Sequence, residues 1–319
     1  MKKFLINNLK YFIALILVVI AGFLYAFDIK LLKNLPYIPL QDWGDTFVDF
    51  LDDNFEFVFN QISAIIDNLN EFINFLLGIV DFEMFGYVFE IPDILVFAVL
   101  ISLVLVIAWW KIFSFVSISF LFISSLGYWE PMMETLGLVL TSTILALIIW
   151  IPLWILKFQF VWAERILDPV LDLMQTLPLF VYLIPAVMFF GIWDVPWVVA
   201  TLIFSMPPAV RLTALGLKQI SKDLLESWKA FGCSYWQLLY KVQIPLALPS
   251  IMMGVNQTIM LSLSMVVVAS MIWASWLGEV VYSAISTLSV GEWIASGIAV
   301  VLLAMMLDRI TRKAASKSE

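Results

Sequence analysis

Residues 211–250 read RLTALGLKQISKDLLESWKAFGCSYWQLLYKVQIPLALPS and separate two apolar runs, at about 196–210 and 251–273. The stretch carries one arginine and four lysines, together with Asp223 and Glu226. A charged segment between two apolar runs is typical of a loop that joins two membrane-spanning helices. The stretch therefore predicts a helical membrane protein with a substantial polar loop between two of its spans.

The composition of the whole chain supports this fold class. Of its 319 residues, 63% are hydrophobic and 13% are charged, which is more apolar surface than a soluble core of this size can bury. We expect an all-α polytopic membrane protein. The sequence contains no histidine and a single cysteine, Cys233, so disulfide frameworks, Cys/His metal sites and histidine-based catalysis are excluded.

Eight apolar runs are close to the roughly 17 to 25 residues that a spanning helix needs. They lie at about 11–27, 93–110, 112–127, 135–156, 172–191, 196–210, 251–273 and 293–308. The first follows a basic head, as in a secretory signal, but no small-x-small cleavage site comes after it, so we interpret it as a retained helix. Lys111 is expected in a turn between two short spans, and one long kinked helix there is the alternative.

The basic residues are unevenly distributed across this topology. With the N-terminus in the cytoplasm, fifteen of the seventeen basic residues lie on the cytoplasmic side, and only Lys30 and Lys33 lie outside. This asymmetry follows the positive-inside rule, which the inverted topology violates. We expect both termini and the loop at 211–250 to be cytoplasmic.

Residues 42–78 are expected outside the membrane as an amphipathic helix. Apolar side chains recur there at steps of three and four residues, a spacing typical of one helix face. These positions are Leu51, Phe55, Val58, Ile62, Ile65, Leu69, Phe72 and Leu76. A scaffold packed on the bundle is favoured over a docking brace for an external partner, because any such helix shows a polar face to water. We therefore divide the chain into residues 1–92 with the first helix and this scaffold, a core at 93–312 and a tail at 313–319.

The loop at 211–250 is expected to be a compact helical knuckle. Pro207 and Pro208 are predicted to end the sixth apolar run, and a new helix is expected near Ser221. Gly232 breaks the helical pattern and permits a positive φ. Two further prolines, at 245 and 249, are predicted to stop the last helix before the chain re-enters the membrane.

Five positions in the knuckle follow a recognisable spacing. Glu226 is followed by a glycine after six residues, and that glycine by aliphatic residues at ten and twelve and a proline at thirteen. The spacing resembles that of the loop by which membrane subunits of binding-protein-dependent ABC importers bind their ATPase. Ser227 and Trp228 stand here in place of two alanines. The resemblance implies an ATPase-coupling role for Glu226, Ser227, Ala230, Gly232, Val242, Ile244, Pro245 and Pro249.

The chain between roughly Leu136 and Arg312 is similar to permeases of quaternary-ammonium importers. These importers carry glycine betaine and proline betaine. The likeness is carried by LDLMQTLPLFVYLIPAVMFFGIWDVPWVVATLIFSMPPAVRLTALGL before the loop and KVQIPLALPSIMMGVNQTIMLSLSMVVVASMI around its end. The resemblance implies a type I ABC importer permease fold in the bacterial cytoplasmic (inner) membrane. It also implies a homodimer, a separate ATPase that holds ATP and magnesium, an external substrate-binding protein, and a role in osmoprotection and amino-acid transport. The chain departs from the family at IWASWLGEVV, where Trp273 and Trp276 are expected to narrow or reshape the outer gate.

Polar groups within the spans are candidates for the translocation pathway, because unsatisfied donors are costly in hydrocarbon. Gln175, Pro178, Tyr182 and Pro185 are expected on one helix face, and Gln257 and Ser264 on another, near Asn256. Packing between helices is an equally weighted role for each of them. No span centre carries an ionisable residue, which argues against a proton- or sodium-coupled carrier.

The tryptophans near the predicted span ends are interpreted as an interfacial aromatic belt rather than a cation-π box. They are Trp109, Trp110, Trp129, Trp150, Trp154, Trp193, Trp197 and Trp293.

The sequence has no G-x-x-x-x-G-K-[ST] phosphate loop, so the chain is not expected to hydrolyse ATP or to act as an enzyme. It also has no basic stripe that would indicate nucleic-acid binding. The favoured function is the pore of an ATP-driven importer of a small methylated osmolyte such as glycine betaine, proline betaine or choline. The alternatives are an ATP-independent osmolyte channel and an importer permease for another small solute.

Overall fold

The computed structural model describes residues 39–79, 82–84, 87–89, 92–108, 110–192, 194–270 and 276–316. The chain divides into two compact units, Met1–Asn54 and Phe55–Glu319, with the boundary inside helix α2 (Leu40–Leu76). The first unit contributes the N-terminal part of α2 to the described residues. The predicted first span at 11–27 lies outside the described residues.

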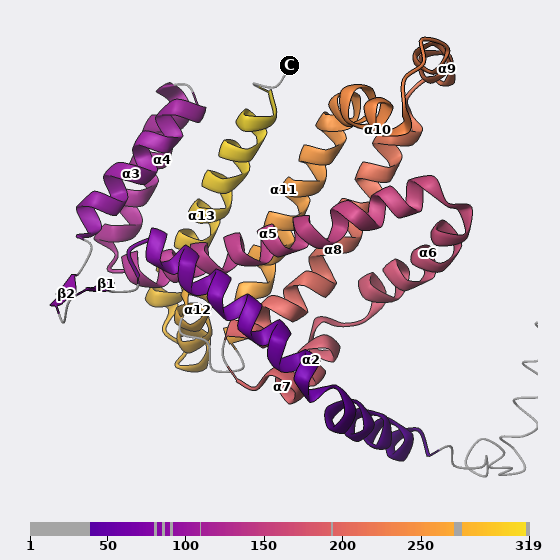
Figure 1. Cartoon of the computed structure of the whole chain (residues 1–319). Coiled ribbons are helices and arrows are strands. Elements are labelled where there is room, and N and C mark those ends of the chain that lie inside the picture. Colours follow the sequence, from indigo (N-terminus) through magenta and orange to yellow (C-terminus); the bar gives the residue numbers. More distant parts are fainter. Residues whose placement is uncertain are drawn as a thin grey trace, which may run out of the picture. The chain divides into compact units, whose positions relative to one another are not determined.

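The second unit is almost entirely helical (Figure 1). Its helices after α2 are α3 (Asp93–Ile107), α4 (Trp110–Ser125), α5 (Trp129–Gln159), α6 (Val161–Thr176), α7 (Leu179–Phe190), α8 (Asp194–Lys218), α9 (Lys222–Ala230), α10 (Tyr235–Leu238), the π-helix η1 (Leu239–Gln243), α11 (Ile244–Ala269), α12 (Leu277–Ser286) and α13 (Val290–Ser316). Strands β1 (Phe82–Met84) and β2 (Tyr87–Phe89) form an antiparallel pair between α2 and α3. The predicted helical fold class is confirmed, with this small hairpin added.

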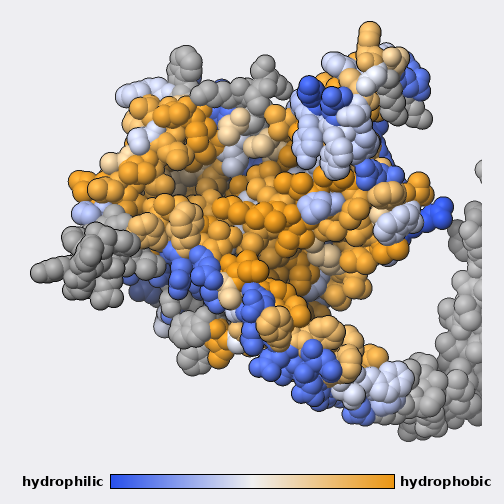
Figure 2. Space-filling view, in the orientation of Figure 1, coloured by the Kyte–Doolittle hydropathy of each residue, from blue (hydrophilic) through white to orange (hydrophobic). Residues whose placement is uncertain are grey.

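Four of the described helices are long and apolar enough to cross a membrane: α5, α8, the continuous stretch Tyr235–Val268 and α13. Apolar side chains also cover much of the visible surface over these helices, whereas hydrophilic residues gather around α9 and α10 and along α2 (Figure 2). A chain whose exterior is apolar over its long helices is built for lipid contact. The predicted multi-pass membrane protein is confirmed.

Helices α3 and α4 form a short antiparallel hairpin. Phe97, near the start of α3, makes an edge contact with Phe120, near the end of α4, at a ring-centroid distance of 6.3 Å. The chain leaves α3 at Ile107 and begins α4 at Trp110. Two short helices are therefore present instead of one long kinked helix, and the break comes just before Lys111, which is the second residue of α4.

The predicted span at 172–191 is not one continuous helix. Helices α6 and α7 meet at an angle of 99°, and Leu177 between them is extended, with φ −69° and ψ 138°. Pro178 restricts the preceding residue to this region and supplies no backbone donor. The Tyr182 hydroxyl on α7 donates to the carbonyl oxygen of Met174 and to that of Leu173 at 3.3 Å, and so satisfies the open end of α6.

Four other prolines do not end helices, contrary to prediction. Helix α8 continues through Pro207 and Pro208 to Lys218, and α11 begins around Pro245 and contains Pro249. Ending a helix in an apolar environment would expose a full set of terminal backbone groups, whereas a proline inside it removes a single hydrogen bond. Continuing the helix is therefore the less costly arrangement at these sites.

The core of the second unit is built around the pairing of α8 with α11. A Cβ added at Gly254 on α11 would lie 3.2 Å from the Ala209 Cα on α8. One added at Gly216 on α8 would collide with the Cβ of Ser250. Small residues at helix contacts let backbones approach closely, as is common inside membranes. Helices α8 and α11 are consequently closely packed, most tightly at Gly216, where an added side chain would force Ser250 to move.

Several tryptophans assigned to an interfacial belt are instead part of this core. Trp150 and Trp197 are fully buried and Trp154 is 2% exposed, whereas Trp110 and Trp293 are more than half exposed. The belt interpretation is wrong for the three buried residues, because helix packing rather than position along the span decides their surroundings. Trp109 and Trp193 lie outside the described residues.

The predicted amphipathic helix at 42–78 is present as α2. Within the second unit, its buried positions are Ile66, Asn70 and Ile73, which lie beside the predicted apolar stripe rather than on it. Asn70 donates to the Asp194 carboxylate at 2.7 Å and accepts from the Thr141 hydroxyl at 3.1 Å. A polar contact thus joins α2 to the start of α8 and the middle of α5, in agreement with a scaffold role.

Candidate coupling loop and translocation path

Helix α9 carries the first half of the predicted coupling motif. Glu226, Ser227 and Ala230 are all exposed on it, and the Ser227 hydroxyl donates to the Asp223 carbonyl oxygen one turn earlier at 2.8 Å. The helix begins at Lys222, as the predicted restart near Ser221 requires. Glu226 is therefore presented to the surroundings from a short helix between two spans.

Gly232 ends α9 in the left-handed conformation that the sequence predicts. Its φ is +78°, and the Cys233 N–H donates back to the Trp228 carbonyl oxygen at 3.3 Å, which closes the helix with a Schellman-type turn. A Cβ added at Gly232 would meet nothing within 4 Å. The constraint on this position is backbone conformation, since there is open space for a side chain.

The second half of the motif returns the chain into the membrane without a break. Ser234 and Gln237 form a capping box at the start of α10, with bonds of 3.4 Å and 2.9 Å between side chains and backbone. Helix α10 continues through η1 into α11, and the Ile244 N–H donates to the Leu239 carbonyl oxygen, five residues back. This wider π-turn accommodates the missing donor of Pro245.

The motif therefore has an exposed part and an anchored part. Val242 is 5% exposed and Ile244 is half-buried, whereas Pro245 and Pro249 are exposed. The aliphatic positions fix the base of the knuckle against the bundle, and the segment from Glu226 to Gly232 projects from it. Force applied to α9 would be transmitted into α8 on one side and α11 on the other.

Aromatic side chains cover the projecting surface. Phe231 is 86% exposed, and Trp236 and Tyr240 on α10 and η1 are 58% and 60% exposed and stack with a centroid distance of 6.0 Å. Exposed aromatic surface of this kind is typical of a protein contact. The sequence analysis did not single out Trp236 and Tyr240, because nothing in the local spacing shows which aromatic side chains of the loop are exposed.

Three ion pairs hold α6 beside α5 and α8. The acidic residues Glu164, Asp168 and Asp172 recur every four residues on α6, and they pair with Lys218 of α8, Lys157 of α5 and Arg211 of α8. The sequence analysis did not find these pairs, because nothing local indicates which cation each carboxylate meets.

Three of the predicted pathway residues do not share a face. Gln175 lies on α6 and accepts from the Arg211 guanidinium at 2.9 Å. Pro178 lies at the bend before α7, and the hydroxyl of the buried Tyr182 is bonded to the end of α6. The expectation of one continuous helical face is wrong, because the bend at Pro178 separates the residues.

On α11 the predicted pathway residues take different positions. Asn256 donates to the Asp308 carboxylate at 2.8 Å and accepts from the Thr311 hydroxyl at 2.9 Å, so it joins α11 to α13. Gln257 is exposed and lines a hollow with Met252, Met253 and Arg312, among others. Ser264 is also exposed and donates to the Met260 carbonyl oxygen within its own helix at 2.9 Å. A pathway role remains a prediction for Gln257 and Ser264.

Comparison with known proteins agrees with this arrangement of loop and spans. Residues 148–312 match the family described as "Binding-protein-dependent transport system inner membrane component". The chain belongs to this family. It is a membrane permease subunit and not itself an enzyme.

Relatives of this permease cover most of its length. It is 46% identical over 285 residues to the glycine betaine transport system permease protein OpuAB of Bacillus subtilis, covering 88% of this chain and 96% of that protein. It is 46% identical over 290 residues to the glycine betaine/carnitine transport permease protein GbuB of Listeria monocytogenes, covering 88% and 97%. It is 41% identical over 281 residues to the glycine betaine/proline betaine permease ProW of Escherichia coli, covering 86% and 75%.

A solved structure shows the same fold. An inward-facing structure of the MetNI methionine ABC transporter contains a chain that matches the permease with a TM-score of 0.54 at 18% identity. The match covers 58% of the permease and 93% of that chain. The type I importer permease fold is confirmed.

The end of the permease opposite the loop is closely packed around the start of α12. Trp276 is 4% exposed and meets Trp197 edge to face at a centroid distance of 5.2 Å. The Leu277 N–H donates to the Thr135 hydroxyl at 3.1 Å. Trp276 thus lies in a junction of α12 with α8 and α5. Trp273 lies outside the described residues, and a gate formed by the two tryptophans remains a prediction.

Proposed function

We propose that this permease forms the pore of an ATP-driven importer of a small methylated osmolyte, with glycine betaine, proline betaine and choline as the leading candidates. The exposed segment from Glu226 to Gly232, anchored between α8 and α11, is the observation that carries the ATP-driven part of the proposal. The names of the relatives support the substrate class. A permease for another small solute would use the same loop. The loop therefore supports the ATP-driven mechanism and does not bear on which solute is carried.

We propose that the permease lies in a bacterial inner membrane and has three protein partners. A separate ATPase subunit holds ATP and magnesium and binds the loop on the cytoplasmic side, where both termini of the permease also lie. An external binding protein delivers substrate, and a second copy of the chain completes the pore. The basic residues on α8, η1 and α13 near the loop support this orientation under the positive-inside rule.

Transport in this proposal follows alternating access. ATP draws the two ATPase subunits together, α9 moves with them, and the closely packed α8 and α11 carry the motion towards α12. The closeness of Gly216 to Ser250 and of Gly254 to Ala209 supports transmission along this pair. An ATP-independent channel would leave the projecting aromatic surface without a partner.

Gly232→Val tests the coupling role of the loop. A β-branched residue is strained at a φ of +78°, and we expect glycine betaine uptake to fall at least tenfold while the permease remains folded in the membrane. Gly127→Val is the matched control, because Gly127 has a φ of +80°, also ends a helix and also has open space around it. Equal loss of uptake in the two variants at equal protein level would contradict the coupling role.

Gentle purification from the native membrane tests the partner. We expect a soluble ATPase to elute in equal amount with the wild-type permease and with Gly127→Val, and to be depleted with Gly232→Val. Recovery of the wild-type permease alone in several mild detergents, with uptake that persists without ATP, would favour the channel.

A further inference from the structure

The turn between α12 and α13 contains a leucine in a conformation that favours glycine. Leu288 has a φ of 53°, and it is the one non-glycine residue with positive φ in the described part of the chain. The Ser289 N–H donates to the Ala284 carbonyl oxygen at 2.9 Å, and the Leu288 N–H donates to the Ile285 carbonyl oxygen at 3.2 Å. This pair of bonds is a Schellman motif with Leu288 at the left-handed position.

The same motif ends three other helices of this chain, each time with glycine. Gly78 follows α2, Gly127 follows α4 and Gly232 follows α9, and all three have φ between 70° and 80°. In each turn the next residue donates back to the helix: Ile79 to Asn74, Tyr128 to Ile123, and Cys233 to Trp228. Because a side chain is strained in this conformation, a leucine at position 288 indicates an offsetting contact.

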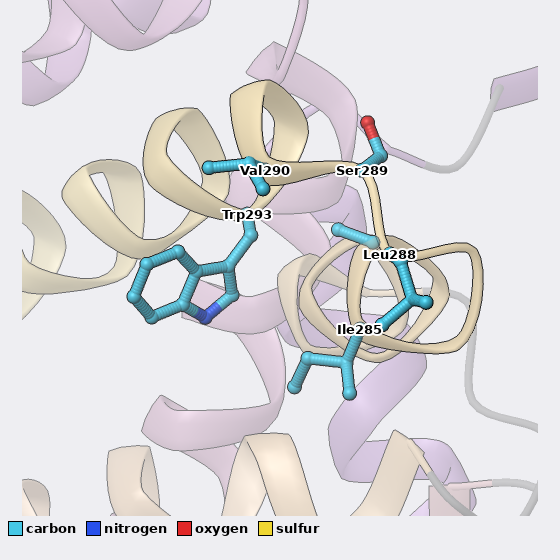
Figure 3. Close-up of a pocket in the computed structure, with 6 residues that line it drawn as sticks. Ile285, Leu288, Ser289, Val290 and Trp293 are labelled. Carbon is cyan, nitrogen blue, oxygen red and sulfur yellow. The ribbon is translucent and has the colours of Figure 1, made fainter.

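No such contact is present within the described chain. The Leu288 side chain is 85% exposed. It lies at the rim of a small hollow together with Ile285 from the end of α12, and Val290 and Trp293 from the start of α13 (Figure 3). These three neighbours are 51%, 66% and 51% exposed. Ala284 and Ser289 complete the lining, which carries no charged side chain. The hollow offers apolar surface and one hydroxyl to an occupant.

The position of the hollow indicates what the occupant is. Helix α11 runs from the α10 end of the unit to α12, so the α12–α13 turn lies at the opposite end of the spans from α9 (Figure 1). An exposed apolar stripe continues from the hollow along α13, at Val290, Ile294, Ile298, Val301 and Met305. Helix α13 is a candidate span by length and composition, and only 22% of its apolar window is buried within the chain, so most of this stripe is available for contact with hydrocarbon. Trp293 in the first turn is a residue type enriched where hydrocarbon meets the headgroups.

We propose that the hollow at the α12–α13 turn binds an acyl chain of a membrane lipid, in the leaflet opposite the α9–α10 loop. Leu288 inserts beside the chain as an apolar wedge, and the bound chain continues the hydrocarbon contact of the α13 stripe. Burial of the leucine in lipid offsets its backbone strain. The lipid contact anchors the α12 end of the bundle at a defined membrane depth.

Spin-label accessibility tests this placement independently of transport. In a Cys233→Ser background, Leu288→Cys and the control Ser286→Cys are labelled with a nitroxide in nanodiscs of phosphatidylethanolamine and phosphatidylglycerol. Ser286 is exposed on the same turn, but it lies outside the hollow. At position 288 we expect collisions with oxygen, which partitions into lipid, to exceed those with a water-soluble nickel chelate. A lower ratio is expected at 286.

Two results would overturn the proposal. Greater access of the nickel chelate than of oxygen at 288 would place the turn in water. Low access of both reagents would mean that a protein surface, such as a second copy of the chain, covers it.

Fluorescence quenching tests whether an acyl chain enters the hollow itself. Lipids with brominated chains are expected to quench wild-type fluorescence more than that of Trp293→Phe, and the difference is assigned to Trp293. Leu288→Asp should shrink this difference, because a charge at the rim excludes the chain. Leu288→Asn, which tolerates the left-handed conformation without bearing a charge, controls for loss of the leucine. An unchanged Trp293 contribution in Leu288→Asp would contradict binding in the hollow.

Discussion

Gly278 shows how closely single residues are packed at the start of α12. A Cβ added there would collide with the Val266 carbonyl oxygen of α11 and lie 2.9 Å from its carbonyl carbon. Both atoms belong to the backbone, so no side-chain rotation can make room. The neighbouring Leu277 is fully buried and bonded through its N–H to Thr135, so α12 has little freedom to move away.

Gly278→Ala is therefore expected to destabilise the permease by about 1–3 kcal/mol, as overpacking of a close contact usually does. Gly291→Ala is the control, because a Cβ there meets nothing within 4 Å and alanine favours the helix by about 0.5–1 kcal/mol. The measurement is the thermal unfolding midpoint of the purified proteins in identical nanodiscs. A midpoint for Gly278→Ala at or above wild type would show that α12 is not held against α11 as described.

At the scale of elements, carboxylates on α6 hold it against α5 and α8. The basic side chains that pair with these carboxylates differ in how deeply they are buried. The side chain of Lys157 is 7% exposed where it pairs with Asp168, whereas that of Arg211 is 36% exposed where it pairs with Asp172. An exposed ion pair contributes little because water screens it and solvates the separated partners. Loss of the partner of a buried cation leaves an uncompensated charge.

Asp168→Asn is expected to cost about 1–3 kcal/mol of stability, less than for a fully buried pair because Asp168 is itself 41% exposed. Asp172→Asn should cost at most about 1 kcal/mol. The double variant Lys157→Met/Asp168→Leu should recover most of the loss, because it removes both charges. Unfolding midpoints of the three variants in one lipid composition provide the comparison. Similar midpoints for the two single variants would show that the burial of Lys157 does not control the stability of the α5–α6 junction.

At the scale of the whole molecule, α8 and α11 connect the loop to α12 as one packed pair. The Cβ of Ala209 and a Cβ added at Gly254 would be 3.5 Å apart, at the lower limit of the separation of about 3.5–4.5 Å usual across a disulfide. If α8 and α11 move as one rigid body during transport, their separation stays constant. A covalent link between them would then not hinder the transport cycle.

Ala209→Cys/Gly254→Cys, in a Cys233→Ser background, should therefore form a disulfide on mild oxidation and keep most of its uptake. Each single variant serves as a control for the substitution itself. Uptake that collapses on oxidation and returns on reduction, only in the double variant, would show that α8 and α11 slide past each other during the transport cycle.

Local signals account for what could be predicted at the site. The spacing from Glu226 to Pro245 identified the loop, and Gly232 was correctly assigned a positive φ because the conformational freedom of glycine is a property of the residue itself. The helical repeat at 42–78 likewise predicted α2. The apolar stripe did not identify its buried face, since Asn70 packs inward through bonds to Asp194 and Thr141, far away in the sequence.

The sequence by itself determined the membrane class, the positions of the four long apolar helices and the loop between α8 and α11, because composition and residue spacing act locally. Only the tertiary structure decided which prolines interrupt a helix. Pro178 breaks the chain where the Tyr182 hydroxyl satisfies the open end of α6, whereas α8 runs on through the buried Pro207. A proline removes the same donor everywhere, and only the surrounding helices determine whether the freed backbone groups find another partner.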